Sequence, residues 1–568
     1  MPWITKGLSF SGYVAVDYHA RDQKKFFDMW DTYTYNPLTK EYDKRTTNTN
    51  GGVRDLNQNH DDNSRTSLFF KLAYDRTFGD HTIGVFIGYE QSKYQGEYFS
   101  AFRKDFMSSK PDYLNFGGDK DKSNSGYGYH ESKQNIFGRF NYNFQDKYLV
   151  EFTLRRDGSM NFAPKKRWGT FPGVSVGWRF GQEKFIQDNT DIVDDLKLRA
   201  SWGKLGNDRV DAFQYLSTYT MGAGAILGTD PERSKGFAPG LIGNTNITWE
   251  KVDTKNIGID GSLWHGMLGF TAEYFYQKRK DILTPKNASI PDYTGLTLPD
   301  QNIGEVSNQG VEIMLTHRNR IGNVSYFVSG NLTYTRNKII YFDEAQTVPE
   351  WQRRTGKSID TYLMYKSDGI YQTQEEIDNT PHLAGAQPGD IKYVDINNDG
   401  KITSDDRIRS DYGNIPRIIY GINYGAEWKG IGINMTWTGQ GQANQMIVPY
   451  SYNLDKDYYN NRWISAEETP NSKYPRAFNK DGDNNTNWSD FWLYDASFLR
   501  LKNLEVYYNF PTKITSKIGL QNLRVFFSGT NLFVLDKIKL QDPESDATST
   551  GQSYPLQRVF TFGLNVSF

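Results

Sequence analysis

Residues 135–180 read NIFGRFNYNFQDKYLVEFTLRRDGSMNFAPKKRWGTFPGVSVGWRF. In the first part of this stretch, large apolar side chains recur at even positions with polar residues between them: Ile136, Phe140, Tyr142 and Phe144. The second part repeats the alternation: Tyr148, Val150, Phe152 and Leu154. A period of two is typical of a β-strand with one apolar face. Because only Gln145–Lys147 separates the two runs, the pattern predicts two antiparallel strands joined by a tight turn.

A long polar connection follows this hairpin, over residues 156–169, and a third alternating run then begins near Val174. The same criteria predict about sixteen strands along the chain. They lie at Leu8–Tyr18, Ser67–Arg76, His81–Tyr94, Asn135–Phe144, Tyr148–Leu154, Val174–Phe180, Leu196–Lys204, Ile247–Leu263, Met267–Ile282, Gly310–Arg318, Val324–Arg336, Arg417–Trp428, Ile431–Trp437, Phe498–Phe510, Leu523–Phe533 and Arg558–Phe568.

The predicted connections alternate between short turns and long loops. The shortest turns lie at residues 78–80, 145–147, 265–266 and 429–430, and a helical turn is predicted at 183–187. The long polar loops cover residues 21–64, 95–129, 207–246, 283–309, 337–415 and 438–494. Such alternation is typical of transmembrane β-barrels, in which short turns face the periplasm and long loops face the outside.

The composition agrees with an all-β, transmembrane, antiparallel up-and-down β-barrel. Hydrophobic residues make up 37% of the chain and mean hydropathy is −0.70, and no run approaches the ~20 apolar residues of a membrane helix. Aromatic residues nevertheless make up 15%. A barrel accounts for both facts, because each strand shows only half of its side chains to lipid. The net charge of −1 gives no basic field for nucleic acid, and the absence of Cys excludes thiolate chemistry.

The last predicted strand shows this two-faced pattern clearly. Apolar side chains share one face: Phe560, Phe562, Leu564 and Val566. Small or polar residues share the other face: Thr561, Gly563, Asn565 and Ser567. The strand is therefore predicted to face lipid on one side only.

Six stretches, in order, resemble the SusC/RagA-like branch of TonB-dependent outer-membrane transporters. They are Asn135–Tyr142, Asp157–Phe162 with Trp168–Phe180, Leu196–Asp208, Pro388–Gly400, Asp495–Val506 and Ser528–Phe533. The resemblance implies a barrel of about 22 strands, of which this chain would supply the last sixteen. It also implies a signal peptide, a plug domain and a TonB-contacting segment, none of which the chain shows. Residues 1–568 are accordingly expected to be one barrel domain that is incomplete at its N-terminus.

The same resemblance implies a function and partners. We expect non-enzymatic import of oligosaccharides or peptides across the cell outer membrane, driven by TonB and assisted by a SusD-like surface lipoprotein. The barrel would contact outer-membrane lipid, and no nucleic acid is expected. The alternative is a secreted, calcium-stiffened all-β module that binds or degrades glycans.

One predicted loop carries the spacing of a calcium site. Residues 395–406 read DINNDGKITSDD, which places oxygen ligands at positions one, three, five, seven and twelve of an EF-hand-like loop. The ligands would be the side chains of Asp395, Asn397, Asp399 and Asp406 and the backbone carbonyl of Lys401. An Asx-rich turn without metal is the other interpretation. A bound Ca²⁺ would stiffen an external loop.

Catalytic motifs find no support in the chain. Gly173–Gly177 has the spelling of a nucleophile elbow but lies within a predicted strand, and the seven His residues form no HExxH. Aromatic residues of the long loops, in contrast, could stack on a substrate: Trp351, Tyr450, Trp463 and Trp488. Packing within the loops explains each of them equally well.

Overall fold

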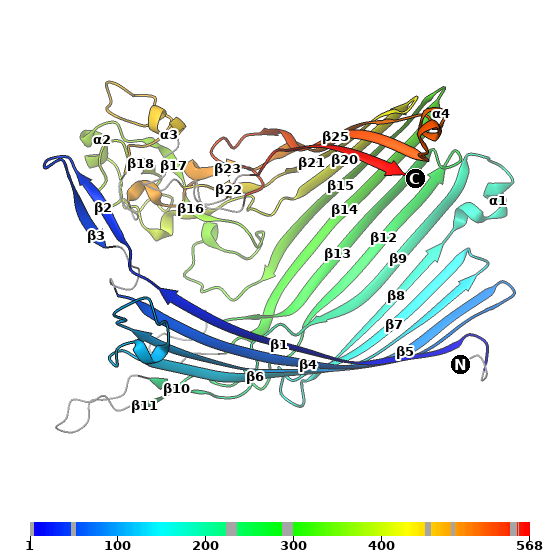
Figure 1. Ribbon diagram of the computed structural model, residues 1–568, viewed down its shortest axis with the longest axis horizontal. Helices are drawn as coiled ribbons and strands as arrows, with labels where there is room; N and C mark the ends of the chain where they lie inside the picture. Colours follow the sequence, from blue (N-terminus) through cyan, green and yellow to red (C-terminus); the bar gives the residue numbers. More distant parts are fainter. Residues whose placement is uncertain are drawn as a thin grey trace. The chain divides into compact units, whose positions relative to one another are not determined.

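The computed structural model describes residues 5–46, 53–222, 236–286, 299–448, 456–478, 483–545, 554 and 556–568. Its main element is a sixteen-stranded sheet in which each strand neighbours the next long strand of the chain (Figure 1). The strands are β1 (Leu8–Phe27), β4 (Asp55–Phe78), β5 (His81–Lys104), β6 (Ser123–Phe144), β7 (Tyr148–Ser159), β8 (Trp168–Trp178), β9 (Val193–Asn207), β12 (Glu250–Leu263), β13 (Leu268–Thr284), β14 (Gln301–Ile321), β15 (Val324–Tyr341), β20 (Ile418–Trp428), β21 (Ile431–Gly441), β24 (Phe498–Asn509), β25 (Asn522–Asp536) and β26 (Val559–Ser567). The predicted strand number and the up-and-down order are confirmed.

Smaller elements lie in the connections. Short strands pair as β2 (Asp31–Asn36) with β3 (Glu41–Thr46), β10 (Tyr219–Gly222) with β11 (Gly236–Pro239), β16 (Leu363–Tyr365) with β19 (Arg407–Arg409), β17 (Ser367–Ile370) with β18 (Ile391–Tyr393), and β22 (Asn444–Met446) with β23 (Leu493–Asp495). The α-helices are α1 (Lys184–Gln187), α2 (Gln374–Asp378), α3 (Lys456–Asn461) and α4 (Thr512–Thr515). The first of them confirms the predicted helical turn. No helix in the described part of the chain has the length and apolar character needed to cross a membrane.

The chain divides into two compact units. Unit 1 comprises residues 1–142, 152–172 and 208–248, and unit 2 comprises residues 143–151, 173–207 and 249–568. In unit 1, β1 pairs with β4 along its whole length, from Leu8 opposite Tyr74 to Phe27 opposite Asp55. In unit 2, the long strands β12 to β15, β20, β21 and β24 to β26 pair antiparallel in chain order, and the β13–β14, β14–β15, β21–β24 and β24–β25 pairs each contain a shift of register.

Two loop predictions in unit 1 are wrong in their extent. Residues 21–64 were expected to be one loop, but β1 continues to Phe27 and β4 begins at Asp55. Residues 95–129 were expected to be another, but β5 continues to Lys104 and β6 begins at Ser123. The alternation is lost here for two reasons. β4 begins with mostly polar residues, and at the end of β5 aromatic residues fall at both even and odd positions, as Tyr98, Phe99 and Phe102 do. The backbone hydrogen bonds of the ladder do not depend on side-chain polarity and continue past that point.

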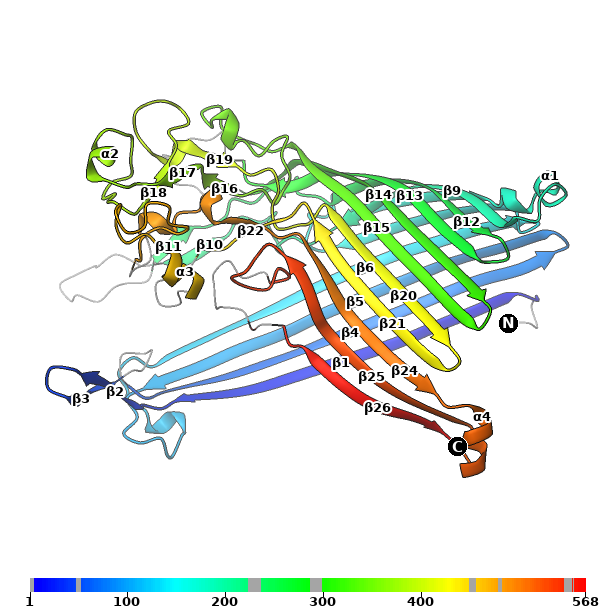
Figure 2. The same ribbon diagram turned by 90° about the horizontal axis from the view of Figure 1, so that it is seen from above.

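The short turns are as predicted. The β12–β13 connection bends through Trp264, His265 and Gly266, all of which have positive φ. The β20–β21 connection bends through Lys429 (φ 50°) and Gly430 (φ 88°). Within unit 2, these turns and α4 lie at one end of the strands, whereas α2 and α3 lie at the opposite end with the long loops (Figures 1 and 2).

The two faces of the sheet differ as the C-terminal pattern predicts. On β26 the exposed fractions are 60% for Phe560, 81% for Phe562, 66% for Leu564 and 39% for Val566. Their partners on β25 share this apolar face, because Phe562 lies opposite Phe527 and Leu564 opposite Val525. The other face carries polar side chains, and on it Thr436 donates a hydrogen bond to Asn423 at 2.9 Å.

Candidate functional site

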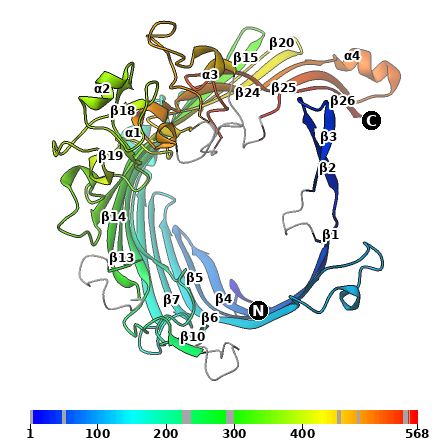
Figure 3. The same cartoon turned by 90° about the vertical axis from the view of Figure 1, so that its left-hand side faces the viewer.

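Two long loops of unit 2 form a folded body at the ends of their strands. The first loop, residues 342–417, connects β15 to β20, and the second, residues 442–497, connects β21 to β24. Figure 3 shows α2, α3, β18 and β19 grouped together. Backbone N–H groups join the two loops: Tyr365 donates to the Trp488 carbonyl (2.9 Å), Ser367 to Asp490 (2.7 Å), Ile391 to Asn485 (2.9 Å) and Arg476 to the Gly389 carbonyl (2.8 Å). We call the described parts of these two loops the loop assembly.

A hydrophobic core fills the loop assembly. The first loop contributes Met364, Tyr365, Ile391, Tyr393 and Ile402, and the second contributes Met446, Tyr458, Tyr474, Phe478 and Trp492. Trp492 is fully buried, and the Tyr458 and Tyr474 rings stack with centroids 4.9 Å apart. The two loops are therefore joined by a contiguous hydrophobic core, as the elements of a globular domain are.

A buried ion pair lies beside this core. The carboxylate of Asp390 is inaccessible to solvent and lies 2.6 Å from Nε of Arg476, while Asn485 donates an amide hydrogen bond to it at 2.8 Å. Arg476 also contacts Asp483 at 2.9 Å. Burial raises the pKa of Asp390, although Arg476 acts in the opposite direction. Burial would lower the pKa of Arg476, but Asp390 and Asp483 outweigh it and hold that pKa above its usual value.

Two of the predicted substrate residues are accessible. Trp351 is 36% exposed, and its indole N–H donates to the Asp405 carbonyl at 2.8 Å. Trp488 is 45% exposed and packs edge-on against Tyr362, with ring centroids 5.7 Å apart. Each therefore presents part of a ring that is fixed in orientation by a neighbour.

The other two predicted substrate residues differ from these. Trp463 is half-buried; its indole N–H donates to the Gln372 side chain at 3.1 Å, and its ring lies so close to Gly389 that a Cβ there would approach within 2.3 Å. Packing between the two loops thus uses much of this ring. Tyr450 lies outside the described residues.

The first half of the predicted calcium loop brings its oxygen atoms together. The N–H of Asp399 donates to side-chain oxygens of both Asp395 (3.3 Å) and Asn397 (3.0 Å), and the N–H of Gly400 donates to Asp395 at 2.8 Å. Asn398 (φ 59°) and Gly400 (φ 82°) make the bends that this arrangement needs. Side-chain oxygens of two candidate ligands, Asp395 and Asn397, therefore accept the same backbone N–H.

Asp406 closes the loop from the other side. Its carboxylate is fully buried and accepts N–H groups of Ile396 (2.9 Å) and Thr403 (2.8 Å), while Lys401 donates its own N–H to Asp399 at 2.9 Å. No set of three or more His, Cys, Asp or Glu side chains within the described ranges is placed to hold a metal. The hydrogen bonds account for an Asx-rich turn, and calcium binding stays a prediction.

A cavity of about 560 Å³ lies beneath the first loop, on the polar face of β12 to β15. Its aliphatic and aromatic walls are Val252, Ile282, Val306, Ile339, Phe342, Ile359 and Ile415. Arg354 is among the polar groups that line it, and its guanidinium lies 4.6 Å from the Phe342 ring centre. Arg279 also lines it, with its guanidinium 3.8 Å from Glu250.

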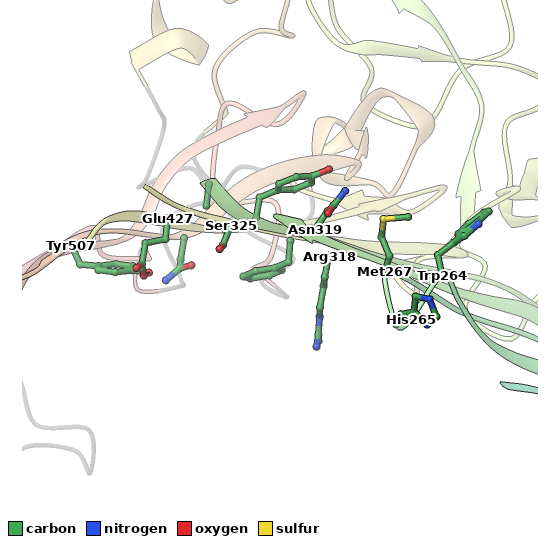
Figure 4. A pocket seen from close by; sticks show the side chains of 14 residues that line it. Trp264, His265, Met267, Arg318, Asn319, Ser325, Glu427 and Tyr507 are labelled. Atoms are coloured by element: carbon green, nitrogen blue, oxygen red, sulfur yellow. The ribbon is translucent and has the colours of Figure 1, made fainter. Parts of the chain in front are cut away.

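A second cavity, of about 770 Å³, lies at the short-turn end of unit 2 (Figure 4). Trp264 and His265 line it on one side and Glu427 and Tyr507 on the other. The Tyr507 hydroxyl donates to Glu427 at 2.9 Å. The recess therefore lies far along the strands from the loop assembly and has acidic and aromatic groups on its wall.

The polar face also carries a charged network that the sequence did not indicate. Arg199 on β9 bonds Asp260 (3.1 Å) and Asn256 (3.3 Å) on β12 and Glu273 on β13. Its guanidinium lies over Gly258, where a Cβ would come within 2.9 Å. The alternating sequence pattern predicts that these residues lie on the polar face. Their contacts depend on the register between the strands, which the sequence pattern does not give.

Comparisons with known proteins agree with this architecture. The family model described as TonB dependent receptor-like, beta-barrel matches residues 6–532. TonB-dependent receptor P3 of Formosa agariphila is 29% identical over 535 residues, which cover 88% of this chain and 52% of that protein. TonB-dependent receptor SusC of Bacteroides thetaiotaomicron is 25% identical over 523 residues, covering 88% and 49%. The chain thus spans about half the length of the curated relatives it matches.

The structure of the RagAB peptide transporter shares the fold, with a TM-score of 0.77 at 22% identity over 99% of this chain and 60% of that chain. The apolar face of the sheet is accordingly its lipid-facing side, and the polar face lines the lumen. The SusC/RagA-like resemblance and the outer-membrane location predicted from the motifs are confirmed. The chain belongs to the TonB-dependent receptor-like β-barrel family of outer-membrane proteins.

Proposed function

We propose that this chain is the barrel part of an importer that carries oligosaccharides or peptides across the outer membrane. The observation that supports the proposal most directly is the loop assembly, a folded body at the long-loop end of the strands with a cavity of about 560 Å³ beneath it on the polar face. Ligand sites of this size are usual for small solutes. RagAB is named a peptide transporter, which supports peptides as the substrate. Oligosaccharides stay in the proposal because of the SusC-like sequence motifs.

TonB would drive this import, and a SusD-like surface lipoprotein would work beside the loop assembly. The family membership supports the first partner and the relatives support the second. The outer-membrane family gives no support to the alternative of a secreted calcium-stiffened module. Trp351 and Trp488 are the proposed substrate contacts, because both present accessible ring surface in the loop assembly.

Uptake by the protein in its own outer membrane tests this function. Cells would receive a fluorescent oligosaccharide mixture or a fluorescent peptide mixture, with and without a protonophore. We expect saturable uptake of one mixture, its loss with the protonophore, and about tenfold weaker uptake for Trp488→Ala if stacking contributes about 1.4 kcal/mol. Uptake that is the same in cells lacking the protein would contradict the proposal.

We also propose that Ca²⁺ binds residues 395–406 and stiffens the first loop. The convergence of Asp395 and Asn397 on the N–H of Asp399 supports it, and such loops bind calcium through oxygen atoms at this spacing. Calorimetry on the purified protein should detect one binding event that Asp399→Ala abolishes. Asp405→Ala is the matched control, because that residue is outside the proposed ligand set. Equal calcium uptake by the wild type and Asp399→Ala would exclude the site.

A further inference from the structure

Basic side chains gather on the lipid-facing side of unit 2, toward the long-loop end of its strands. β9, β12, β13, β14 and β15 lie next to one another there (Figure 2). We call the following residues the outer cationic row: Lys204 on β9, Lys251 and Lys255 on β12, Lys278 and Lys280 on β13, and Arg336 and Lys338 on β15. The strand register places them on one face with lipid-facing residues, since Lys255 lies opposite Trp202 and Tyr276.

The outer cationic row begins where the apolar band ends. On β13 the lipid-facing positions run from Leu268 through Phe270 and Tyr274 to Lys278. At about 3.3 Å per residue and a tilt of about 40°, ten residues rise about 25 Å along the membrane normal. This equals the height of about 25 Å that the apolar band of such barrels has. The cations therefore lie at the level of the lipid headgroups of the outer leaflet.

The row has more cations than its neighbouring carboxylates neutralise. Lys278 pairs with Glu305 at 2.7 Å, and Lys251 with Asp281 at 2.9 Å. Asp253 lies directly opposite both Lys204 and Lys278 in the ladder. The remaining cations have no ion pair recorded within the described residues: Lys255, Lys280, Arg336 and Lys338. A net positive row thus faces the headgroup layer.

A small cavity lies at the β15 end of this row. It measures about 280 Å³ and opens where β15 and β20 diverge, between residues 336–337, 356–358 and 411–417. Arg336, Lys357 and Arg417 line it, with Asp411 as the acidic group. Arg417 is held in place, since its guanidinium donates to the Asp411 carbonyl at 2.9 Å. Asn337 and Arg417 have the polar-face parity of their strands, so of these cations only Arg336 belongs to the outer cationic row.

We propose that the outer cationic row binds the phosphate groups of outer-leaflet lipid. Arg and Lys are the side chains that suit phosphate, Arg through bidentate contacts and Lys as a point charge. The row is on the lipid-facing side, so its ligand comes from the membrane and not from the solutes that pass through the lumen. Bound lipid would connect the ends of β9, β12, β13 and β15.

Native mass spectrometry tests this proposal. The protein would be extracted from its outer membrane, and the retention of lipid A would be compared between wild type and the triple variant Lys255→Gln, Arg336→Gln, Lys338→Gln. We expect retention to fall at least about tenfold, given the contribution of each basic residue near an anionic membrane surface. The matched control removes three exposed cations at the short-turn end, Lys429→Gln, Lys513→Gln and Lys517→Gln, and should retain lipid A as the wild type does.

A second measurement does not depend on the variants. Wild-type protein in phosphatidylethanolamine nanodiscs would receive either lipid A or lipid A from which the phosphates have been removed. Binding of only the phosphorylated form is expected. Equal binding of both forms, or equal loss of lipid A from the test and control variants, would overturn the proposal. These readouts involve no transported solute, so they are independent of the import assay.

Discussion

Aromatic side chains have opposite environments in the loop assembly and in the sheet. Trp492 and Tyr458 of the loop assembly are 0% and 1% exposed, whereas Phe560 and Phe562 of β26 are 60% and 81% exposed. The loop assembly lies in water and gains stability by removing such rings from it. The sheet lies in lipid, where the same rings face the solvent they prefer and the backbone ladder holds the strands. Aromatic side chains are therefore buried in the part of the chain that lies in water and exposed in the part that lies in lipid.

Removing one aromatic ring from each region should have very different effects on the stability of the loop assembly. Trp492→Ala should lower the local unfolding free energy of the loop assembly by about 3–5 kcal/mol, as is usual for deleting a buried aromatic ring. Phe562→Ala should leave that free energy unchanged. Hydrogen exchange in residues 362–393 and 456–478 would measure the difference. Unchanged exchange in Trp492→Ala would mean that the aromatic core does not hold the two loops.

The buried ion pair extends the comparison, because the loop assembly also holds a fully buried carboxylate, Asp390, whereas the apolar band of the sheet has none on β26. Asp390→Ala removes acceptors used by Arg476 and Asn485 and should cost about 1.5–3 kcal/mol. Asp390→Asn should cost less, because burial already disfavours the charged form of Asp390. Hydrogen exchange of Ile391 and its neighbours would rank the variants. An equal loss of stability in Asp390→Ala and Asp390→Asn would mean that the charge of Asp390 accounts for the whole effect.

The smallest expected effect concerns acid sensitivity of the first loop. Glu344 accepts N–H groups of Arg354 (2.6 Å) and Thr355 (3.1 Å). Burial acts to raise the pKa of Glu344, but these hydrogen bonds outweigh it and hold the pKa below its usual value of 4.5. The stabilisation is therefore complete above pH 4.5 and is lost as the pH falls below it. Hydrogen-exchange protection of the Arg354 and Thr355 amides at a series of pH values would detect this loss.

Glu344→Gln is the matched variant for that experiment. It keeps the shape of the side chain, should destabilise the loop by about 1 kcal/mol at neutral pH, and should remove the acid dependence. Protection of these amides in the wild type that stays constant from pH 6 to pH 3 would contradict the assignment.

The lipid-level part of the fold could be predicted from the sequence, because alternation exists only where one face meets lipid and the other meets water. The strands around Tyr148 and Phe562 followed from that pattern, as did the turns at His265 and Lys429. Above the membrane both faces meet water, so the pattern disappears although the strands continue. This is why the ends of β1 and β4 were interpreted as loops.

The candidate site was less predictable. The calcium-like spacing at residues 395–406 could be predicted because it is a local sequence motif. The loop tryptophans could be singled out because Trp is a rare residue. The Asp390–Arg476 pair and the Arg199 network were not, since each joins residues that are distant in sequence. A carboxylate in a polar loop gives no sign that it will be buried.

The path of the chain between the two loops has a consequence for how the protein assembles. Asn485 and Asp390 are 95 residues apart in sequence, and β20 and β21 lie between them. Closing so long a segment is slow and costs entropy, whereas a formed β20–β21 hairpin brings its two ends together and shortens the effective distance. The contact between the loops therefore has to wait for that hairpin. An ordered loop assembly on the cell surface would report that the strands below it have already been inserted.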